Sequence, residues 1–424
     1  MNVALRWSLL AVCGLTLMTS SAHAQTPPPD QAPPADPTPP PPPTPPPPPP
    51  EPAPMAPPPP PPAATATAKP TAQGPLKIET PNGSNIKFGL LLQPQFQSAS
   101  SATLDGYSNN LYLRRTRILI GGTLFGVLDY FVDTDFPNLF LATNVVGAAP
   151  PDTAVKATPG MNIQDAFATY KPMGDVFKVD AGYMLPPLAH NAVQGATTLY
   201  SWDYFAYTFQ SSNSFNSSAN PIGRDLGVQL RGLVLGNHLE YRLGLFQGLR
   251  VGQTMTEVAS RNMFRATGRV QINLLDAETG FFYAGTYLGA KKILSLGGAF
   301  DVQDDYLYWA GDVFVDLPLG PGVLTAQVNV GHWDGGTFIP TLVEQTAVMG
   351  EAGFLIAGIQ LCPIVRGEHL WVTGAPDQTR LGGGLAFFPY GHNTNLKAFY
   401  TNFKTEGAAR AVNQFNVQWQ LYFF

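Results

Sequence analysis

From residue 85 to the end of the chain, apolar and polar residues alternate with period two, which is the spacing of a β-strand. In residues 86–97 most even positions are apolar, whereas Lys87, Gln93, Gln95 and Gln97 occupy odd positions. Residues 128–136, 238–247 and 415–423 repeat the alternation. The pattern therefore predicts strands with one apolar face and one polar face.

Sixteen such strands can be placed. They are expected to start near residues 86, 111, 127, 161, 176, 224, 238, 263, 291, 306, 323, 347, 359, 381, 395 and 413. Short turns are expected at 122–126, 171–175, 233–237, 317–322, 357–358 and 391–394, and long loops at 137–160, 186–223, 248–262 and 333–346. Residues 281–288 look strand-like, but counting them would break the alternation of turns and loops, so we assign them to a long turn.

The alternation alone fits a soluble sandwich, with apolar residues inside, or a membrane barrel, with apolar residues facing lipid. Charged residues make up only 12% of the chain, about half of the roughly 25% usual for soluble domains. Aromatic residues near strand ends, such as Tyr112, Trp309 and Trp333, would suit the girdles of a membrane barrel. We therefore predict an all-β fold, a transmembrane antiparallel β-barrel of about 16 strands preceded by a disordered proline-rich segment.

The first 75 residues predict export. Arg6, an apolar stretch and the small residues Ala22 and Ala24 match a secretory signal peptide at 1–24. Residues 25–75 hold 27 of the 43 prolines and predict an extended periplasmic spacer that could contact the cell wall. Residues 76–424 are then the barrel, localised to the bacterial outer membrane.

The polar face carries charges that are expected to line a lumen. By parity Arg115 and Arg117 point inward, facing an acidic row on the next strand. Such rows either set ion selectivity or form ion pairs that only stabilise a solvated wall, and both interpretations stay open. The alternation places Arg114 on the face toward lipid, where its long side chain would extend the charge to the membrane–water interface. The pore-lining candidates are Lys87, Arg115, Arg117, Asp129, Asp133, Asp135, Arg231, Arg242, Arg265 and Arg269, and further inward positions are Lys178, Asp180, Asp225, Asp312 and Asp316.

Several blocks resemble the phosphate-selective porin O and P family. They are LRRTRI at 113–118, GGTLFG at 121–126, DTDF at 133–136, GRDLGVQL at 223–230, QLCPIVR at 360–366, GHNTNLK at 391–397 and NQFNVQWQ at 413–420. The resemblance implies a sixteen-stranded outer-membrane porin, often a homotrimer, with extracellular loops folded inward and passive diffusion of small solutes, including anions such as phosphate. The final Phe424 is similar to the terminal aromatic residue that the barrel-assembly machinery recognises, although the apolar row of the last strand includes Phe423.

The chain also departs from that family. Where the family commonly has a lysine before a Pro-Phe pair, residues 182–187 read GYMLPP, and acidic residues outnumber basic ones by 29 to 24. The loop at 186–223 is instead rich in aromatic residues. Its constriction candidates Tyr200, Trp202, Tyr204 and Tyr207 would suit sugars or other organic solutes.

Other functions find less support in the sequence. The HNTN block at 392–395 lacks the serine of a phospholipase barrel, so no catalytic residue is assigned and no enzyme is expected. The histidines show no metal-ligand spacing and no cofactor motif is present, so neither metal nor cofactor is expected. The formal charge of -5 does not provide the excess of basic residues that is typical of nucleic-acid-binding proteins. A structural alternative is an outer-membrane anchor whose proline-rich tether carries the function.

Overall fold

The computed structural model describes residues 76–102, 105–144, 154–156, 160–209, 223–249, 263–278 and 283–424. The expected signal peptide and proline-rich spacer lie outside these residues. Sixteen strands form the barrel: β2 Asn85–Ser100, β3 Tyr107–Leu124, β4 Leu128–Asp135, β7 Asn162–Tyr170, β8 Lys178–Met184, β9 Asp225–Val234, β10 Leu239–Phe246, β11 Arg265–Asn273, β12 Ile293–Gln303, β13 Tyr306–Leu319, β14 Gly322–Asp334, β15 Gln345–Ile356, β16 Leu361–Val372, β17 Gln378–Phe387, β18 Thr394–Thr405 and β19 Val412–Phe423.

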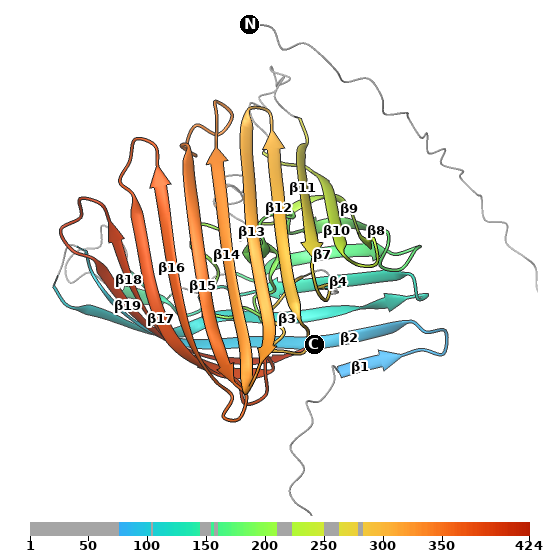
Figure 1. The fold of residues 1–424 in the computed structure, drawn as a ribbon, viewed down its shortest axis with the longest axis horizontal. Helices are drawn as coiled ribbons and strands as arrows, with labels where there is room; N and C mark the ends of the chain where they lie inside the picture. Colours follow the sequence, from blue (N-terminus) through green and yellow to red (C-terminus); the bar gives the residue numbers. More distant parts are fainter. Residues whose placement is uncertain are drawn as a thin grey trace, which may run out of the picture. The chain divides into compact units, whose positions relative to one another are not determined.

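All neighbouring strands are antiparallel, and the sheet closes on itself because β19 pairs with β2. Figure 1 shows the strands as a continuous wall around the lumen. Closure removes the exposed sheet edges that an open sheet would present. The all-β antiparallel barrel is confirmed, and every strand begins within four residues of its expected start.

The two faces of the wall follow the predicted parity. Along β2 the odd positions Leu91, Gln93 and Gln95 are buried inside the barrel. Even positions such as Phe96, and Ile118 on the neighbouring β3, are exposed on the outside. An apolar outer face on closed antiparallel strands is the arrangement of a transmembrane barrel.

Four small elements were not predicted. β1 (Leu76–Glu79) pairs only with the first residues of β2, through a turn that contains Gly83 with φ 79°. The β5 (Ala142–Asn144) and β6 (Ala154–Lys156) strands form a separate hairpin in the loop after β4. Among the described residues α1 (His190–Val193) has four residues, and no helix there is long and apolar enough to cross a membrane.

The expected aromatic girdle is only partly correct. Trp309 lies on the outer face, where 47% of its surface is exposed. Tyr112 and Trp333 are buried inside the barrel, and Trp333 packs on Tyr308 with ring centroids 5.1 Å apart. The expectation failed for Tyr112 and Trp333 because closeness to a strand end does not determine whether a side chain faces lipid or the lumen. Its position in the two-residue alternation does.

Glycines shape the wall near the end of the barrel that carries the short turns. A Cβ on Gly122 would lie 2.0 Å from the carbonyl oxygen of Asn85, so the two backbones approach too closely for a side chain. The Tyr130 hydroxyl from β4 donates to the same carbonyl at 3.2 Å. Gly232 on β9, Val176 in the turn before β8 and Tyr241 on β10 repeat this arrangement. Each glycine thus lets a tyrosine reach across the strand and bond the neighbouring backbone.

Candidate functional site: a narrowed lumen

The loop between β8 and β9 folds into the barrel, as the family resemblance implied for an extracellular loop. Residues 185–209 of this loop are described, and most of them are buried. The backbone N–H of His190 donates to Asp312 on β13 at 3.0 Å, and that of Asn191 donates to Asn329 on β14 at 2.9 Å. Near the other end, the Tyr207 hydroxyl donates to Gln378 on β17 at 2.9 Å. We call 185–209 the inner loop, because it crosses the lumen from one wall to the other.

A carboxylate in the inner loop is held by two adjacent arginines of the wall. Asp203 accepts from Arg114 Nε at 2.9 Å and from Arg115 NH2 at 2.6 Å, and all three side chains are largely buried. Burial alone would raise the pKa of Asp203, but the charges of Arg114 and Arg115 outweigh it and hold the pKa well below its usual range. Asp203 is therefore ionised at neutral pH and fixes the middle of the inner loop.

A β-bulge explains why both arginines face inward. Leu92 pairs with Thr116 but Pro94 pairs with Leu113, so Arg114 and Arg115 together oppose Gln93. Proline has no amide hydrogen for the ladder, and bulges are found where a ladder bond is missing. The expectation that Arg114 faces lipid is therefore wrong.

The other inward arginines are also matched by carboxylates. Arg117 bonds Asp133 and Asp135, both at 3.0 Å, as the facing rows in the sequence suggested. Further ion pairs join Arg231 to Asp180, Arg242 to Glu240, Arg265 to Asp301 and Asp225, Arg269 to Asp312, Arg224 to Asp165, and Arg366 to Glu351 and Glu368. The basic candidates thus form compensated pairs along the wall.

Two candidates lie apart from these pairs, near the turn end. Asp129 bonds Lys171 at 2.7 Å and Thr123, also at 2.7 Å. Lys87 is partly buried and stands beside Lys77 of β1 in the register. Lys178 bonds Asp175 in the adjoining turn, and that bond lowers the pKa of the Asp175 carboxyl. The structure therefore does not bring Lys87 or Asp129 to the inner loop.

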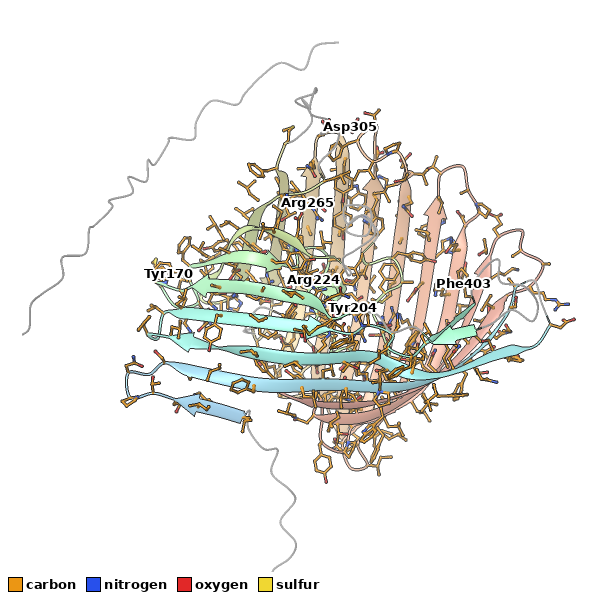
Figure 2. The ribbon with its side chains drawn as sticks, turned by 180° about the vertical axis from the view of Figure 1, so that it is seen from behind. Tyr170, Tyr204, Arg224, Arg265, Asp305 and Phe403 are labelled. Carbon is orange, nitrogen blue, oxygen red and sulfur yellow. The ribbon has the colours of Figure 1, made fainter. Side chains whose placement is uncertain are left out.

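The four aromatic candidates of the loop differ in their surroundings. Tyr200 is 1% exposed, and its hydroxyl lies 2.7 Å from the Sγ of the buried Cys362. Tyr207 is also buried, whereas Trp202 and Tyr204 are partly exposed to the lumen. Tyr204 packs against Phe209 and under the guanidinium of Arg115, with centroid distances of 5.1 and 5.5 Å. Figure 2 shows Tyr204 and Arg224 inside the barrel.

The turn between β11 and β12 meets the inner loop from the opposite end of the barrel. Its described residues 283–288 form no named strand, as expected, but Ala284 makes an isolated bridge with Gln194. The Thr286 N–H donates to the carbonyl of Thr198 at 3.1 Å. The sequence offered no signal for this contact.

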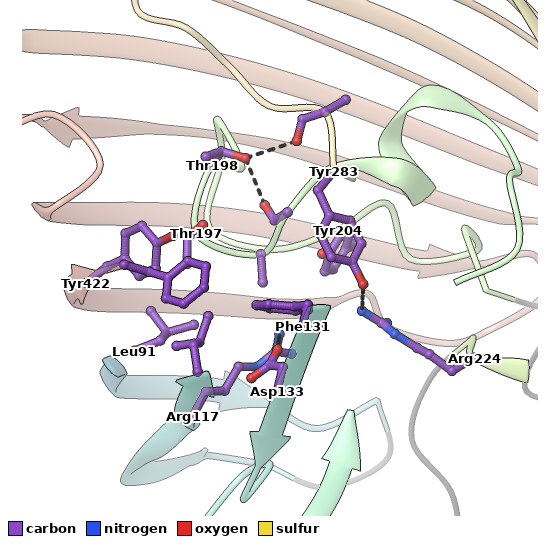
Figure 3. A pocket seen from close by; sticks show the side chains of 15 residues that line it. Leu91, Arg117, Phe131, Asp133, Thr197, Thr198, Tyr204, Arg224, Tyr283 and Tyr422 are labelled. Carbon is purple, nitrogen blue, oxygen red and sulfur yellow. Dashed lines mark hydrogen bonds and ion pairs between the residues drawn. The ribbon is translucent and has the colours of Figure 1, made fainter. Parts of the chain in front are cut away.

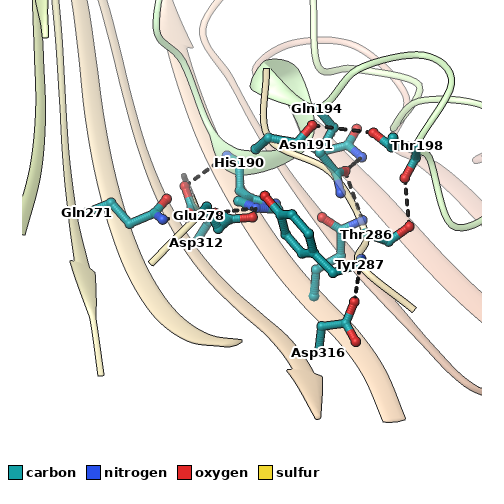
Figure 4. Close-up of polar contacts among 12 residues, drawn as sticks. His190, Asn191, Gln194, Thr198, Gln271, Glu278, Thr286, Tyr287, Asp312 and Asp316 are labelled. Carbon is teal, nitrogen blue, oxygen red and sulfur yellow. Dashed lines mark hydrogen bonds and ion pairs between the residues drawn. The ribbon is translucent and has the colours of Figure 1, made fainter. Parts of the chain in front are cut away.

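A buried polar cluster also joins this turn to the loop (Figure 4). His190 Nε2 lies 3.0 Å from the Glu278 carboxylate, which also accepts from Gln271 at 2.9 Å. Burial would raise the pKa of Glu278, but the facing His190 and the hydrogen bonds lower it below its usual range. Loop and turn are thus tied both through backbone and through an acid–histidine contact.

Among the described residues, cavities of about 190 Å³ lie on either side of Tyr204 of the inner loop, which lines both of them. One cavity is lined by residues from the turn-proximal and middle parts of β2, β3 and β4, including Leu91, Arg117 and Phe131 (Figure 3). The other is lined by Trp202, Asp203 and the loop-proximal halves of β16–β18, including Arg366 and Arg380.

Nothing in the described part of the chain is arranged as a metal centre, since no group of three or more His, Cys, Asp or Glu side chains could hold an ion. Sequence reasoning missed several residues that fix the inner loop, above all Asp203, His190, Glu278 and Arg366. Asp203 carried one signal, since it is the sole acidic residue in the described loop 185–209.

Neither a protein-family model nor a curated protein sequence matches the chain. Solved structures do match in fold. An anion-selective porin from Comamonas acidovorans has a TM-score of 0.54 at 12% identity, covering 80% of this chain and 100% of that one. The outer membrane channel DcaP of Acinetobacter baumannii has 0.52 at 11% identity, covering 82% and 99%. A loop-deletion mutant of the outer membrane protein OmpT of Vibrio cholerae has 0.50 at 12% identity, covering 80% and 99%. The chain therefore has the fold of outer-membrane barrels.

Proposed function

We propose that the chain is an outer-membrane porin, a water-filled channel for passive diffusion of small solutes. One observation carries this proposal: a sixteen-stranded barrel has a polar, charge-paired inner face, and an inward loop narrows its lumen, with cavities of about 190 Å³ beside the described part of that loop. Barrels of sixteen to eighteen strands leave an aqueous channel, whereas a simple anchor needs only about eight. The size of the barrel supports permeation over the anchor alternative.

The pairing of charges bears on selectivity. Each arginine among the pore-lining candidates has at least one carboxylate within 3.4 Å, whereas Arg380 lies 3.9 Å from Glu368. A matched pair contributes little net field along the axis, so a channel of weak ion preference is favoured over a phosphate-selective one. Anion selectivity is the second candidate, supported by the fold similarity to the anion-selective porin of Comamonas acidovorans.

Single-channel recording tests these alternatives. We expect discrete, ohmic current steps from the purified barrel in a planar bilayer, with a small reversal potential across a salt gradient. A strong anion preference with block by millimolar phosphate would replace the first candidate by the second. Absence of current from protein that still shows heat-modifiable mobility on a gel would overturn the channel proposal and favour an anchor.

The cellular setting completes the proposal. The apolar outer face supports contact with outer-membrane lipid, and the signal at 1–24 would deliver the chain there. We further propose a homotrimer, recognition of the last strand and Phe424 by the barrel-assembly machinery, and contact of the spacer 25–75 with the cell wall. The family-level resemblance to phosphate-selective porins supports the trimer, and cross-linking in native outer membranes tests it.

A further inference from the structure

The outer face of the barrel carries a cation near the long-loop end of β18. Lys404 is exposed there, and it points outward because Lys397 and Phe399, at odd positions of the same strand, are buried inside the barrel. Among the described residues no hydrogen bond or ion pair reaches its ammonium group, not even from Glu406 in the following turn. Lysines near the ends of membrane-spanning segments place their charge at the level of the lipid headgroups. Lys404 therefore lies where it can meet an anionic headgroup.

A threonine and a histidine continue the row that Lys404 begins. Lys404 pairs with Thr379 on β17, and Thr379 pairs with His369 on β16. Directly opposite residues of antiparallel strands share a face, so all three side chains point outward side by side. His369 Nδ1 lies 2.8 Å from Thr379 Oγ1. When Nδ1 carries the imidazole hydrogen, the threonine hydroxyl accepts it and keeps its own hydrogen for a ligand. We call His369, Thr379 and Lys404 the polar row.

Two tryptophans place the polar row at the membrane–water interface. Trp371 packs beside His369 with ring centroids 4.3 Å apart, and Trp309 on β13 lies near the same end of the barrel. Both are 47% exposed on the outer face, and exposed tryptophans gather where lipid meets water. The Asp377 carboxylate lies 3.8 Å from His369 Nε2 and accepts from the backbone of β16, so it does not neutralise Lys404. The row thus presents a positive charge at headgroup depth.

Toward the middle of the barrel, the outer face beside the polar row is hollowed. A groove of about 510 Å³ crosses β14–β17, and its surface is almost entirely apolar. Its lining includes Gly350 and Gly367, which are directly paired, and a Cβ on Gly350 would meet open space. The Leu381 side chain stands beside them and is 60% exposed. Gly367 and Leu381 are the next outward positions after His369 and Thr379, so the groove begins at the polar row.

We propose that the polar row and the groove together bind one anionic, phosphate-bearing lipid of the membrane leaflet on the long-loop side. Its phosphate would lie over Thr379 and accept hydrogen bonds from the Lys404 ammonium and the threonine hydroxyl. One acyl chain would lie in the apolar groove. A free phosphate ion would leave the groove empty, so the adjoining apolar surface favours a lipid. The site faces away from the lumen, and the inference therefore goes beyond the proposed channel.

Native mass spectrometry of the full folded barrel, released from detergent, tests the site. Phosphatidic acid is compared with phosphatidylcholine of the same acyl chains, in which a choline cation balances the phosphate charge. We expect one phosphatidic acid per chain to bind about tenfold more tightly, since a hydrogen bond to a charged group has that effect or more. Lys404→Gln should weaken phosphatidic acid about fivefold, the contribution of one lysine near an anionic membrane surface, and leave phosphatidylcholine unchanged.

Lys292→Gln is the matched control. Lys292 is also exposed, but it precedes β12 at the short-turn end of the barrel, away from the polar row. The substitution removes the same charge, and both lipids should bind as they do to the unaltered chain. An equal loss of phosphatidic acid binding in the two variants would show a general effect of net charge and would overturn the proposal.

Equal affinity of the unaltered chain for the two lipids would also refute the site, and this comparison decides alone if Lys404→Gln does not fold. Inorganic phosphate at the concentration of the lipid should not displace phosphatidic acid. Displacement would indicate a site for free anions and would overturn the lipid proposal. The measurement does not depend on current. A conducting barrel that does not prefer phosphatidic acid refutes the site alone, whereas a lipid-binding barrel without conductance refutes the channel alone.

Discussion

Replacing Asp203 by Asn should loosen the inner loop and change the current through the barrel. The substitution keeps the size of the side chain but removes the charge that faces Arg114 and Arg115 at 2.9 and 2.6 Å. Taking one partner from a buried ion pair costs about 3–5 kcal/mol, because the remaining charge is left uncompensated. Because about 1.4 kcal/mol corresponds to a tenfold change in an equilibrium, the population of the state in which residues 202–206 are bound to the wall falls by about two to four powers of ten relative to released states.

The rest of the inner loop keeps its anchors. Lys397 Nζ donates to the carbonyls of Leu199 and Ser201 at 2.7 and 2.9 Å, and Arg366 still reaches the Asp203 carbonyl at 2.7 Å. The barrel should therefore fold normally while the segment around Tyr204 moves. In single-channel recordings we expect a larger mean conductance and more open-channel noise than in the unaltered protein.

Asp105→Asn is the matched control. Asp105 pairs with Arg410 on an exposed loop, where its side chain is 90% exposed, and such pairs contribute little. Conductance and noise should stay at their original values. If Asp203→Asn gives the same current and noise as Asp105→Asn, the ion pair does not hold the loop and the reasoning is wrong.

The pH dependence follows from the sign of the shift. The pKa of Asp203 is lowered in the fold, so its stabilisation is present above the unfolded value of about 3.9 and is lost only as the pH falls below that value. Open-channel noise of the unaltered protein should therefore stay constant between pH 7 and pH 5. A rise in noise over that range would show that another group controls the loop.

Three further predictions concern the wall and its turns. Gly122→Ala should prevent the heat-modifiable barrel from forming because its Cβ would meet the Asn85 carbonyl, whereas Gly311→Ala, with open space around the added Cβ, should fold normally. Lys397→Met should destabilise the barrel by about 1–3 kcal/mol, measured as a lower urea midpoint, because two buried carbonyls lose their donor; an unchanged midpoint would contradict this. Burial and the nearby Lys397 lower the pKa of His392 to about 4, so the fold favours the neutral imidazole. The free energy of unfolding should therefore fall by about 2 kcal/mol between pH 7 and pH 5, measured as a lower Tm. His392→Gln should abolish that fall, and an equal fall in both proteins would refute the prediction.

Period-two alternation was enough to predict the wall, since each residue's face follows from counting along a strand. It placed Arg117 opposite Asp133 and Asp135, and the structure pairs these side chains. It failed at Arg114, where the bulge beside Pro94 shifts the count by one. The aromatic-girdle expectation failed at Trp333 because it relied on closeness to a strand end, whereas the alternation along β14 places this residue inside the barrel. The path of the inner loop depends on contacts across 80 to 200 residues, such as Lys397 to Leu199, and local patterns do not encode these.

The position of Phe424 has a consequence for the order of assembly. Gln93 on the first barrel strand bonds Gln420 on the last at 2.8 Å, across 327 positions of sequence. Contacts of such separation form late, because the entropy of closing a long chain segment opposes them. The inner loop depends on the same final strands, since Gln420 and Lys397 hold its carbonyls. An intermediate in which β18 and β19 are not yet paired therefore lacks these bonds to the inner loop. It also lacks the packing of Phe424 against Phe131, Gly89 and Gly121. The inner loop would dock in the lumen and β19 would pair with β2 in one cooperative step, at the end of folding.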